Sequence, residues 1–318
     1  MTSKQNVFPR KITAAQLGGN VKVHDFWNTE PCGSHFVKAE PGSAEFYRSY
    51  TEFRYQKEWH LPRLVPFTDA RGKNVLEVGC GNGADGVRFA QAGARYTGID
   101  LTEAAVTATR DHFRLLGLEG DFCQGNADQL AFPDASFDIV YSHGVLHHTP
   151  DPERSFAEVY RVLRPGGQAI LMLYHKHSFN YYVRIMSYMR LRVVMRILAR
   201  TGRLSEDRAQ LGDKLRGIRG NQDPGIWDIH YQNFLRSGWS YLRARNFIHH
   251  ATDGPECPYA FVYTTAQVQR VFCNFKKIRT KVAHFPLRSY PVGRGLPLLV
   301  EEKLAPLLGW YLFIYLEK

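Results

Sequence analysis

The stretch "VLEVGCGNGAD", residues 75–85, decides the fold of this 318-residue chain. An apolar run typical of a β-strand leads into Gly79, Gly81 and Gly83 and then directly into a helical pattern. Glycines permit a tight turn and let the backbone approach a ligand closely, and the first turn of the helix offers free amide donors. The stretch therefore predicts a ligand-binding loop between a strand and a helix.

Residues 61–175 extend this pattern into alternating strands and helices. The strand "ARYTGID" ends in Asp100, 17 residues after Gly83, where a carboxylate can accept hydrogen bonds from both ribose hydroxyls of a nucleoside. The glycine loop and Asp100 fit NAD, FAD and S-adenosylmethionine equally. The alternation predicts an α/β fold with an open, doubly wound, mostly parallel sheet that binds ligands at the carboxyl ends of its strands.

The composition narrows the class of protein further. With 44% hydrophobic and 13% aromatic residues the chain can bury a large core. Its five cysteines are an odd number without a CxxC pair, which argues against a disulfide framework and a four-cysteine zinc site. The N-terminus has no apolar core of signal-peptide type, and no stretch reaches the roughly 20 apolar residues of a membrane span. We therefore expect a cytoplasmic protein.

Positive charge is concentrated in one segment. The net charge is +11, and residues 176–220 hold 11 Lys and Arg against 3 Asp and Glu. Arg184, Arg192, Arg196 and Arg200 follow one another at multiples of four, which predicts one basic helical face beside a broad apolar surface. Such a block suits nucleic acid, an anionic membrane surface, an anionic substrate or simply a solvated helix.

Three features together resemble the class I S-adenosylmethionine-dependent methyltransferases: the motif E-x-G-x-G-x-G at 77–83, Asp100, and "GNADQLAFPDASFDIVYSHGVLHHTPDPERSFAEVYRVLRPGGQAILMLY" at 125–174. The resemblance covers about residues 70–175. It implies a Rossmann-like sheet of seven strands that ends in an antiparallel strand pair, S-adenosylmethionine as cofactor, and methyltransferase activity.

Composition and the resemblance together predict four segments. We expect an N-terminal cap over residues 1–60, the cofactor-binding core over 61–175, a basic helical insertion on the substrate side over 176–250, and a return to the sheet over 251–318. The insertion would thus precede the last two strands.

The resemblance also implies which residues hold the cofactor. They lie in the glycine loop, at the end of the second strand and after the next two strands: Glu77, Gly79, Cys80, Gly81, Gly83, Asp100, Leu101, Asn126, Ala127 and Ser142. Asp100 would bind the ribose hydroxyls and Leu101 would pack on the adenine. Asn126 stands where the family usually has an acidic residue; its carbonyl still accepts a hydrogen bond, and the choice between Asn126 and Asp128 stays open.

The segments "FWNTEPCGSHF" (26–36) and "EFRYQKEWH" (52–60) resemble a subgroup of bacterial small-molecule methyltransferases whose N-terminal region closes over the cofactor. By that resemblance Trp27, Tyr47, Arg54 and Tyr55 are candidates for a lid. Arg54 would pair with the cofactor carboxylate, and the rings would shield the sulfonium. A helix packed on the sheet explains the same residues equally well.

Histidines supply the candidates for acid–base chemistry. "SHGVLHHTPD" (142–151) contributes His143 and His147, and "FIHHATDGPECPYAFVY" (247–263) contributes His249 and Tyr263 as possible catalytic groups. Loop packing is the alternative for each. No spacing of carboxylates or cysteines around these histidines indicates three or four convergent ligands, so we expect no metal.

These features favour S-adenosylmethionine-dependent methyl transfer to a small-molecule acceptor, with the nucleophile aligned with the S–CH3 bond. Methylation of RNA or of an anionic lipid through the basic insertion is the first alternative, although no RNA-binding motif supports a nucleic-acid partner. A non-catalytic cofactor-binding protein is the second alternative. A peripheral membrane contact and a homodimer also stay open.

Overall fold

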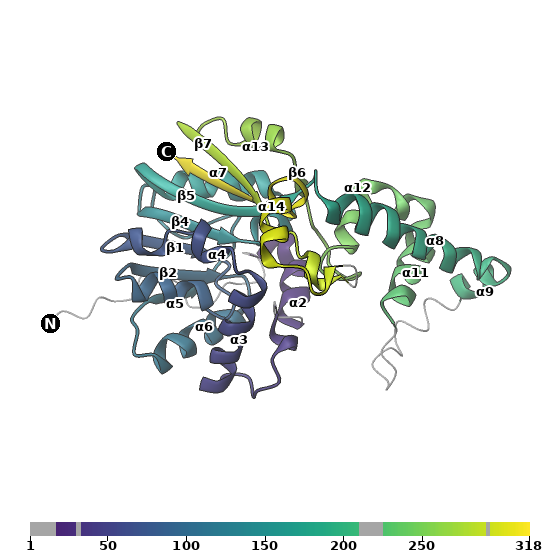
Figure 1. Ribbon diagram of the computed structural model, residues 1–318, viewed down its shortest axis with the longest axis horizontal. Coiled ribbons are helices and arrows are strands. Elements are labelled where there is room, and N and C mark those ends of the chain that lie inside the picture. The colour runs from purple at the N-terminus through teal and green to yellow at the C-terminus, as the bar shows by residue number, and fades with distance from the viewer. Residues whose placement is uncertain (1–16, 30–32, 210–224, 291–292) are drawn as a thin grey trace.

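The computed structural model describes residues 17–29, 33–209, 225–290 and 293–318. Their centre is an eight-stranded sheet with the order β3-β2-β1-β4-β5-β8-β7, in which β6 pairs with β5 (Figure 1). The strands are β1 (Asn74–Val78), β2 (Arg95–Asp100), β3 (Asp121–Gln124), β4 (Phe137–His143), β5 (Leu163–His175), β6 (Val262–Tyr263), β7 (Lys277–Ala283) and β8 (Tyr311–Glu317). β8 runs antiparallel to both β5 and β7, and the other pairings are parallel.

The sheet is buried on both faces, as a parallel sheet with helical crossovers requires. The crossover helices are α5 (Ala84–Gln91), α6 (Glu103–Leu115), α7 (Pro152–Val162) and α13 (Thr265–Val271). Val75 belongs to one core with α5 and α6, whereas its neighbour Leu76 belongs to a second core with α7 and α13. Successive side chains of one strand thus point to opposite faces, which makes the sheet doubly wound.

The fold predicted from the sequence is confirmed, with two additions. The last two long strands are antiparallel, as expected, and Thr102 caps α6 by accepting a hydrogen bond from the Ala105 amide at 3.3 Å. β6 was not expected, because two residues are too short to show a periodic pattern. A 3-10 turn, η9 (Leu287–Ser289), and the helix α14 (Leu298–Leu308) connect β7 to β8.

The N-terminal segment forms helices that pack on the crossover helices. Its elements are η1 (Gly18–Asn20), α2 (Val21–Thr29), η2 (Ser34–Phe36), α3 (Ala44–Lys57), α4 (Leu61–Leu64) and η3 (Phe67–Ala70). Ser43 begins α3 by accepting a hydrogen bond from the Phe46 amide at 3.1 Å. α3 contacts α5 and α6, and α2 contacts α6, so this segment lies next to the loops at the carboxyl ends of the strands.

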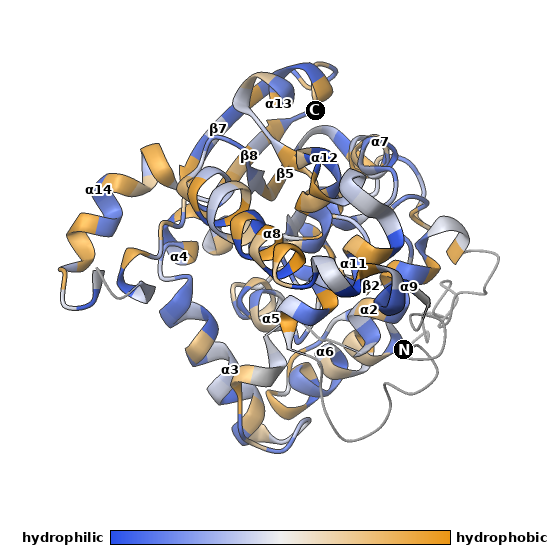
Figure 2. Cartoon of the chain, turned by 90° about the vertical axis from the view of Figure 1, so that its right-hand side faces the viewer, coloured by the Kyte–Doolittle hydropathy of each residue, from blue (hydrophilic) through white to orange (hydrophobic). Residues whose placement is uncertain are grey.

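A helical insertion between β5 and β6 projects from one end of the sheet (Figure 1). It consists of the π-helical η5 (Asn180–Met189), α8 (Arg190–Leu198), η6 (Thr201–Arg203), α9 (Leu204–Ala209), α11 (Ile226–Ser237), η7 (Gly238–Leu242), α12 (Ala244–Phe247) and η8 (Ile248–His250). Figure 2 looks onto this insertion, with α8 and α11 facing the viewer. Within the described ranges, no helix has both the length and the apolarity needed to cross a bilayer.

Candidate active site

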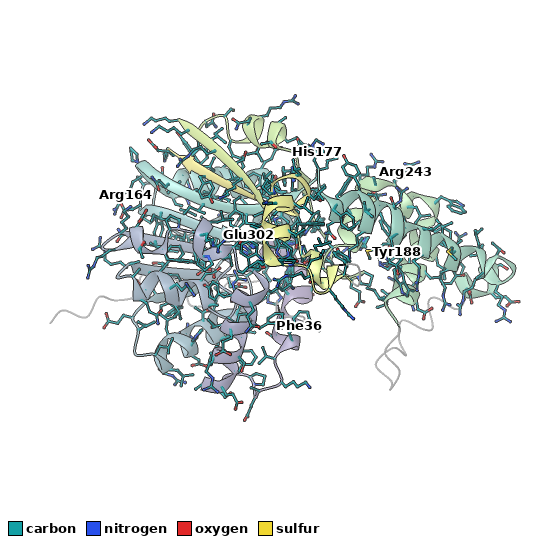
Figure 3. The ribbon with its side chains drawn as sticks, in the orientation of Figure 1. Phe36, Arg164, His177, Tyr188, Arg243 and Glu302 are labelled. Carbon is teal, nitrogen blue, oxygen red and sulfur yellow. The ribbon has the colours of Figure 1, made fainter. Side chains whose placement is uncertain are left out.

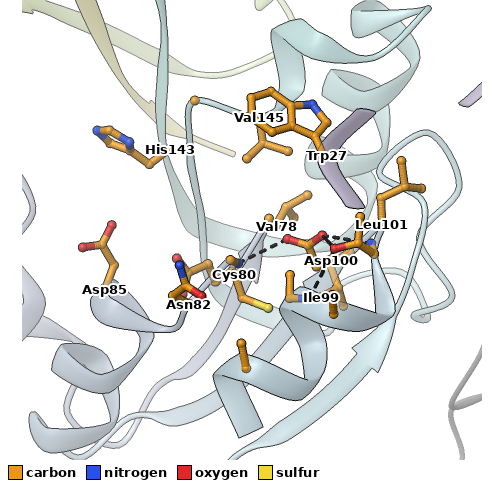
Figure 4. A pocket seen from close by; sticks show the side chains of 18 of the residues that line it. Trp27, Val78, Cys80, Asn82, Asp85, Ile99, Asp100, Leu101, His143 and Val145 are labelled. Atoms are coloured by element: carbon orange, nitrogen blue, oxygen red, sulfur yellow. Dashed lines mark hydrogen bonds between the residues drawn. The ribbon is translucent and has the colours of Figure 1, made fainter. Parts of the chain in front are cut away.

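A cavity of about 370 Å³ lies at the carboxyl ends of β1, β2 and β4, next to α2 and α3 of the N-terminal segment. This volume is in the range of small-molecule sites. Figure 4 shows Asp100 and Leu101 at one end of the cavity and Asp85 and His143 at the other. Its walls therefore come from segments that are far apart in the sequence.

The glycine loop forms one wall, and its glycines are required by geometry. Gly79, Gly81 and Gly83 have φ values of +85°, +53° and +78°. A Cβ on Gly79 would lie 2.2 Å from Cγ2 of Val145, and a Cβ on Gly83 would lie 3.2 Å from the Cα of Thr109. A side chain at Gly79 would therefore displace the loop that follows β4.

Asp100, at the end of β2, lies at the edge of the cavity as predicted from the sequence. Its Oδ2 accepts a hydrogen bond from the Gly81 amide at 3.2 Å, and Oδ1 accepts from the amide and the hydroxyl of Thr102 at 2.9 and 3.0 Å. Burial raises the pKa of Asp100, and these hydrogen bonds act in the opposite direction. A carboxylate offers about four lone-pair positions, so Asp100 retains acceptor capacity toward a ligand.

The segment after β3 contributes Asn126 and Ala127 to the wall. Asn20 of η1 also lines the cavity, and its amide donates to Asn126 Oδ1 at 3.2 Å and to Asp128 Oδ2 at 2.7 Å. The other carboxylate oxygen of Asp128 accepts from the Ser155 hydroxyl at 2.5 Å. Oδ1 of Asn126 also accepts from the Asp128 backbone amide at 2.9 Å, so both side chains are engaged within the wall, and of the two only Asn126 lines the cavity.

Glu77 and Cys80 line the middle of the cavity and are both buried. Oε2 of Glu77 accepts a hydrogen bond from the Tyr96 hydroxyl at 2.6 Å. Burial, reinforced by the negative charge of Asp85, raises the pKa of Glu77 well above its usual value. Burial thus disfavours the negative charge of Glu77, and a cationic ligand group beside it would stabilise that charge. Burial likewise raises the pKa of the Cys80 thiol, so Cys80 is a neutral wall residue.

A buried ion pair joins α3 to the start of α5. Arg54 donates through Nε and Nη2 to the carboxylate of Asp85, the Nε bond measuring 3.2 Å, and its Nη1 lies 3.4 Å from Oε2 of Glu58. Asp85 also accepts from the hydroxyls of Tyr55 at 2.7 Å and Tyr141 at 2.8 Å. Burial alone would raise the pKa of Asp85, but Arg54 outweighs it and the pKa lies below its usual value.

The geometry of this pair differs from what was expected of Arg54 and Tyr55. Arg54 lines the cavity, but its guanidinium pairs with two carboxylates of the protein, whereas a pair with the cofactor carboxylate was expected. Tyr55 lies behind the wall, with the guanidinium of Arg88 3.9 Å from its ring centre. Trp27 does line the cavity, and its ring meets that of His148 edge-on at 5.4 Å.

His143 is one of the predicted catalytic residues and lies in the cavity wall. Its Nε2 is 3.6 Å from Oε2 of Glu58, whose Oε1 accepts from the Tyr311 hydroxyl at 2.9 Å. Burial would raise the pKa of Glu58, but Arg54 and His143 outweigh it and lower the pKa to about 2. Burial lowers the pKa of His143.

Besides Tyr55, five other predicted residues do not line the cavity, and one of them is Gly83 at the end of the glycine loop. Ser142 donates its hydroxyl to the Val78 carbonyl at 2.9 Å, inside the sheet. His147 is fully buried, with its ring centre 4.1 Å from that of Tyr174, and burial lowers its pKa well below the usual value. Nδ1 of His249 accepts from the Ala260 amide at 3.0 Å. Tyr263 lies in β6, and burial raises its pKa.

His148 lines the cavity, although His147 was the candidate from this pair. Its Nδ1–H donates to the Tyr259 carbonyl at 2.7 Å, and its Nε2 lies 3.6 Å from Oδ2 of Asp253. Asp253 in turn accepts from the Tyr174 hydroxyl at 2.9 Å. No local motif marks this arrangement, because Tyr259 and Asp253 come from the segment after the insertion.

Cys257 also lies near His148 and Asp253, so the three offer ligand atoms within 4.8 Å of one another. Sγ of Cys257 is 3.9 Å from Nδ1 of His148, which the Tyr259 carbonyl already engages, whereas Asp253 lies near Nε2. The nitrogen of His148 nearest to Cys257 is thus the one that the Tyr259 carbonyl engages, so a metal between the three residues would have to take Nε2 instead. A zinc site needs three or four convergent protein ligands.

Comparison with known proteins agrees with this geometry. Residues 76–171 match the methyltransferase domain family. The chain is 45% identical over 107 residues to the phthiotriol/phenolphthiotriol dimycocerosates methyltransferase of Mycobacterium tuberculosis, covering 33% of this chain and 39% of that protein. It is 37% identical over 125 residues to the ubiquinone biosynthesis O-methyltransferase of Pseudomonas paraeruginosa, covering 38% of this chain and 54% of that protein. The matches thus span about two fifths to one half of these relatives.

Among solved structures, magnesium protoporphyrin IX methyltransferase from Synechocystis with bound SAH aligns over 93% of this chain and 98% of its own, with 14% identity and a TM-score of 0.48. The sequence matches, the glycine loop and the strand order define residues 76–171 as a methyltransferase domain. This domain is of the class I S-adenosylmethionine-dependent type that the sequence motifs predict.

Proposed function

We propose that the protein transfers a methyl group from S-adenosylmethionine to a hydroxyl group of a small-molecule acceptor. The observation that carries this proposal is the cavity of about 370 Å³, which is lined by the glycine loop and Asp100 and by residues of the N-terminal helices. The names of the two curated relatives support a small molecule as acceptor, and one of them is an O-methyltransferase.

The residues of the wall fit the cofactor in charge and hydrogen bonding. Asp100 supplies acceptors for ribose hydroxyls, and Asn126 contributes to the wall on the same side of the cavity. Burial raises the pKa of Glu77, and a neighbouring ammonium or sulfonium would stabilise its negative charge. S-adenosylmethionine, when bound, supplies a methyl group already activated by the positive sulfur. The protein then has to orient the acceptor and exclude water.

We infer that the N-terminal helices exclude water from the cavity. Asn20, Val23 and Trp27 of η1 and α2 cover the side of the cavity that Asn126 and Asp100 form. Arg54 and Asp85 fix α3 against α5 on the other side. The cover therefore rests on polar contacts at both ends of the cavity.

We propose that His148 removes the proton of an acceptor hydroxyl, which requires its buried Nε2 to become accessible when the acceptor binds. A carbonyl oxygen can only accept, so Tyr259 fixes the proton on Nδ1 and leaves the lone pair on Nε2. When Nε2 takes a proton, Asp253 at 3.6 Å stabilises the resulting imidazolium. Catalysis by general base typically contributes about 10²- to 10⁴-fold in rate.

Formation of S-adenosylhomocysteine tests this function. The full chain is incubated with S-adenosylmethionine and, separately, with a panel of small hydroxylated acceptors, with tRNA and with anionic lipid vesicles. We expect turnover with members of the small-molecule panel, with the added methyl on oxygen by mass spectrometry. Turnover with tRNA or intact anionic lipid alone would contradict the proposal.

A further inference from the structure

The helical insertion exposes a row of large apolar side chains. Their exposed fractions are 47% for Val183, 52% for Tyr188, 59% for Leu191, 58% for Met195 and 59% for Leu198. From Tyr188 onward they recur every three or four residues, and Val183 lies one π-helical turn earlier. These five residues form one outward row, called here the outer stripe. Figure 3 labels Tyr188 on the insertion, below Arg243 in this view.

The helix that carries the outer stripe is apolar on two sides. Ile185, Met189, Val193 and Ile197 are buried in the core that α8 shares with α11. A surface helix normally has one apolar side and a polar side opposite. Since the buried row already accounts for folding, the outer stripe needs another explanation. A contiguous exposed apolar row of this kind marks an interaction surface.

The arginines expected to form a basic face are mostly engaged within the insertion. Arg196 pairs with Asp228 of α11, and Arg200 lies 3.4 Å from Asp207 of α9. The guanidinium of Arg192 lies 4.8 Å from the ring centre of Trp227. The expected basic face is therefore a seam between helices, and apolar residues form much of the outer surface.

The charge of the segment that carries the outer stripe indicates what the stripe meets. From Lys176 to Ser205 the sequence contains seven basic residues and no acidic residue. Among the described residues, five of these cations form no ion pair with a carboxylate: Lys176, Arg184, Arg190, Arg192 and Arg203. Exposed apolar residues beside unpaired cations are typical of helices that lie in the headgroup region of anionic membranes.

We propose that the outer stripe docks the protein on an anionic lipid bilayer, with the apolar side chains among the acyl chains and the neighbouring arginines at the phosphates. Tyr188 suits this position, because aromatic rings with a polar end favour the membrane interface. The inference goes beyond methyl transfer and holds whichever acceptor the cavity takes. Burial of apolar area and attraction to anionic lipid would act together.

Vesicle sedimentation with the full chain tests the proposal. We expect the protein to sediment with vesicles of phosphatidylcholine and phosphatidylglycerol, to remain free with phosphatidylcholine alone, and to be released by high salt. The variant L191Q/M195Q/L198Q should lose roughly tenfold or more of its partitioning. The matched control L115Q/L116Q replaces two leucines at the end of α6, away from the insertion, each of which is 48% exposed. It should sediment like the natural protein.

Three results would overturn the proposal. These are no sedimentation with anionic vesicles, equal sedimentation of the natural protein and the stripe variant, and a dimer in light scattering that the stripe variant converts to a monomer. The last result would assign the outer stripe to a second copy of the chain. Affinity for S-adenosylmethionine, measured without vesicles on the same variants, shows that they are folded and separates this test from that of the proposed function.

Discussion

The Nδ1–H of His148 donates to the Tyr259 carbonyl at 2.7 Å, and this single bond leaves Nε2 as the basic atom of a residue in the cavity wall. In His148→Asn the side-chain amide can still donate to Tyr259, but it cannot accept a proton. We expect kcat to fall by about 10²- to 10⁴-fold, with little change in the Kd for S-adenosylmethionine.

Asp253→Asn is the companion variant, because Asp253 acts through His148. It should lower kcat less than His148→Asn does and should also leave cofactor affinity unchanged. Stopped-assay kinetics and calorimetry on both variants give the two quantities. An unchanged kcat in folded His148→Asn would exclude His148 as the base.

Two glycines of the same loop should respond differently to alanine. In Gly79→Ala the new Cβ would meet Val145 at 2.2 Å, whereas the Cβ of Gly81→Ala would have no neighbour within 4 Å. Both positions carry strain from their positive φ, about 1–2 kcal/mol. We therefore expect Gly79→Ala to abolish measurable cofactor binding and Gly81→Ala to weaken it by tenfold or less. Equal affinities for the two variants in calorimetry would refute this account of the loop.

Arg54 should matter to stability because it compensates a buried carboxylate. Arg54→Ala leaves Asp85 buried without its cation, and we expect a loss of about 3–5 kcal/mol in the free energy of unfolding. Arg63→Ala is the matched control, since Arg63 is 67% exposed in its pair with Glu302 and should cost about 1 kcal/mol or less. Urea unfolding measures both. Similar losses for the two variants would show that the Arg54 pair has no special role.

Histidines around Glu58 should make the protein sensitive to acid. Burial lowers the pKa of His60 to about 3 and that of His284 to about 4, against 6.5 for an ordinary histidine. Below pH 6.5 the unfolded chain binds protons that the folded chain does not, so folding stability falls as pH falls. The decline continues toward pH 4, at up to roughly 1.4 kcal/mol per pH unit for each histidine.

Glu58 has little effect in most of this window. Its pKa is lowered to about 2, so its own contribution is present above the ordinary carboxylate pKa and is lost only as pH falls from there toward 2. Urea unfolding between pH 7.5 and 5 measures the histidine effect together with the opposite contribution of Glu77, whose pKa burial raises, and a histidine variant separates the two. His60→Gln should flatten the pH dependence; a slope equal to that of the natural protein would contradict the assignment.

The sequence predicted the local parts of the site and missed the parts that the fold assembles. Gly79 and Asp100 were predictable because each function depends on a strand end and the turn that follows it. Asp85, Glu58 and His148 were not, because their partners Arg54, Tyr311 and Asp253 come from other segments. Periodicity within one strand or helix carries no information about such pairs.

Strand geometry explains the differences among the histidine and serine candidates. Ser142 and His143 are neighbours in β4, so their side chains point to opposite sides, and His143 is the one in the cavity wall. His147 and His148 diverge in the same way in a short 3-10 turn, η4 (Leu146–His148). Which member of each pair faces the cavity depends on the register of β4 and on the segment after the insertion, and no local motif specifies either.

The most direct test of the account is calorimetric titration of the protein and its Asp100→Asn variant with S-adenosylmethionine, S-adenosylhomocysteine and NAD. We predict saturable binding of the two sulfur nucleosides and none of NAD. Affinity should fall by roughly tenfold or more in Asp100→Asn, because a charged acceptor for the ribose hydroxyls is lost. Binding of NAD instead, or equal affinity of the natural protein and a folded Asp100→Asn variant, would contradict the assignment of this cavity.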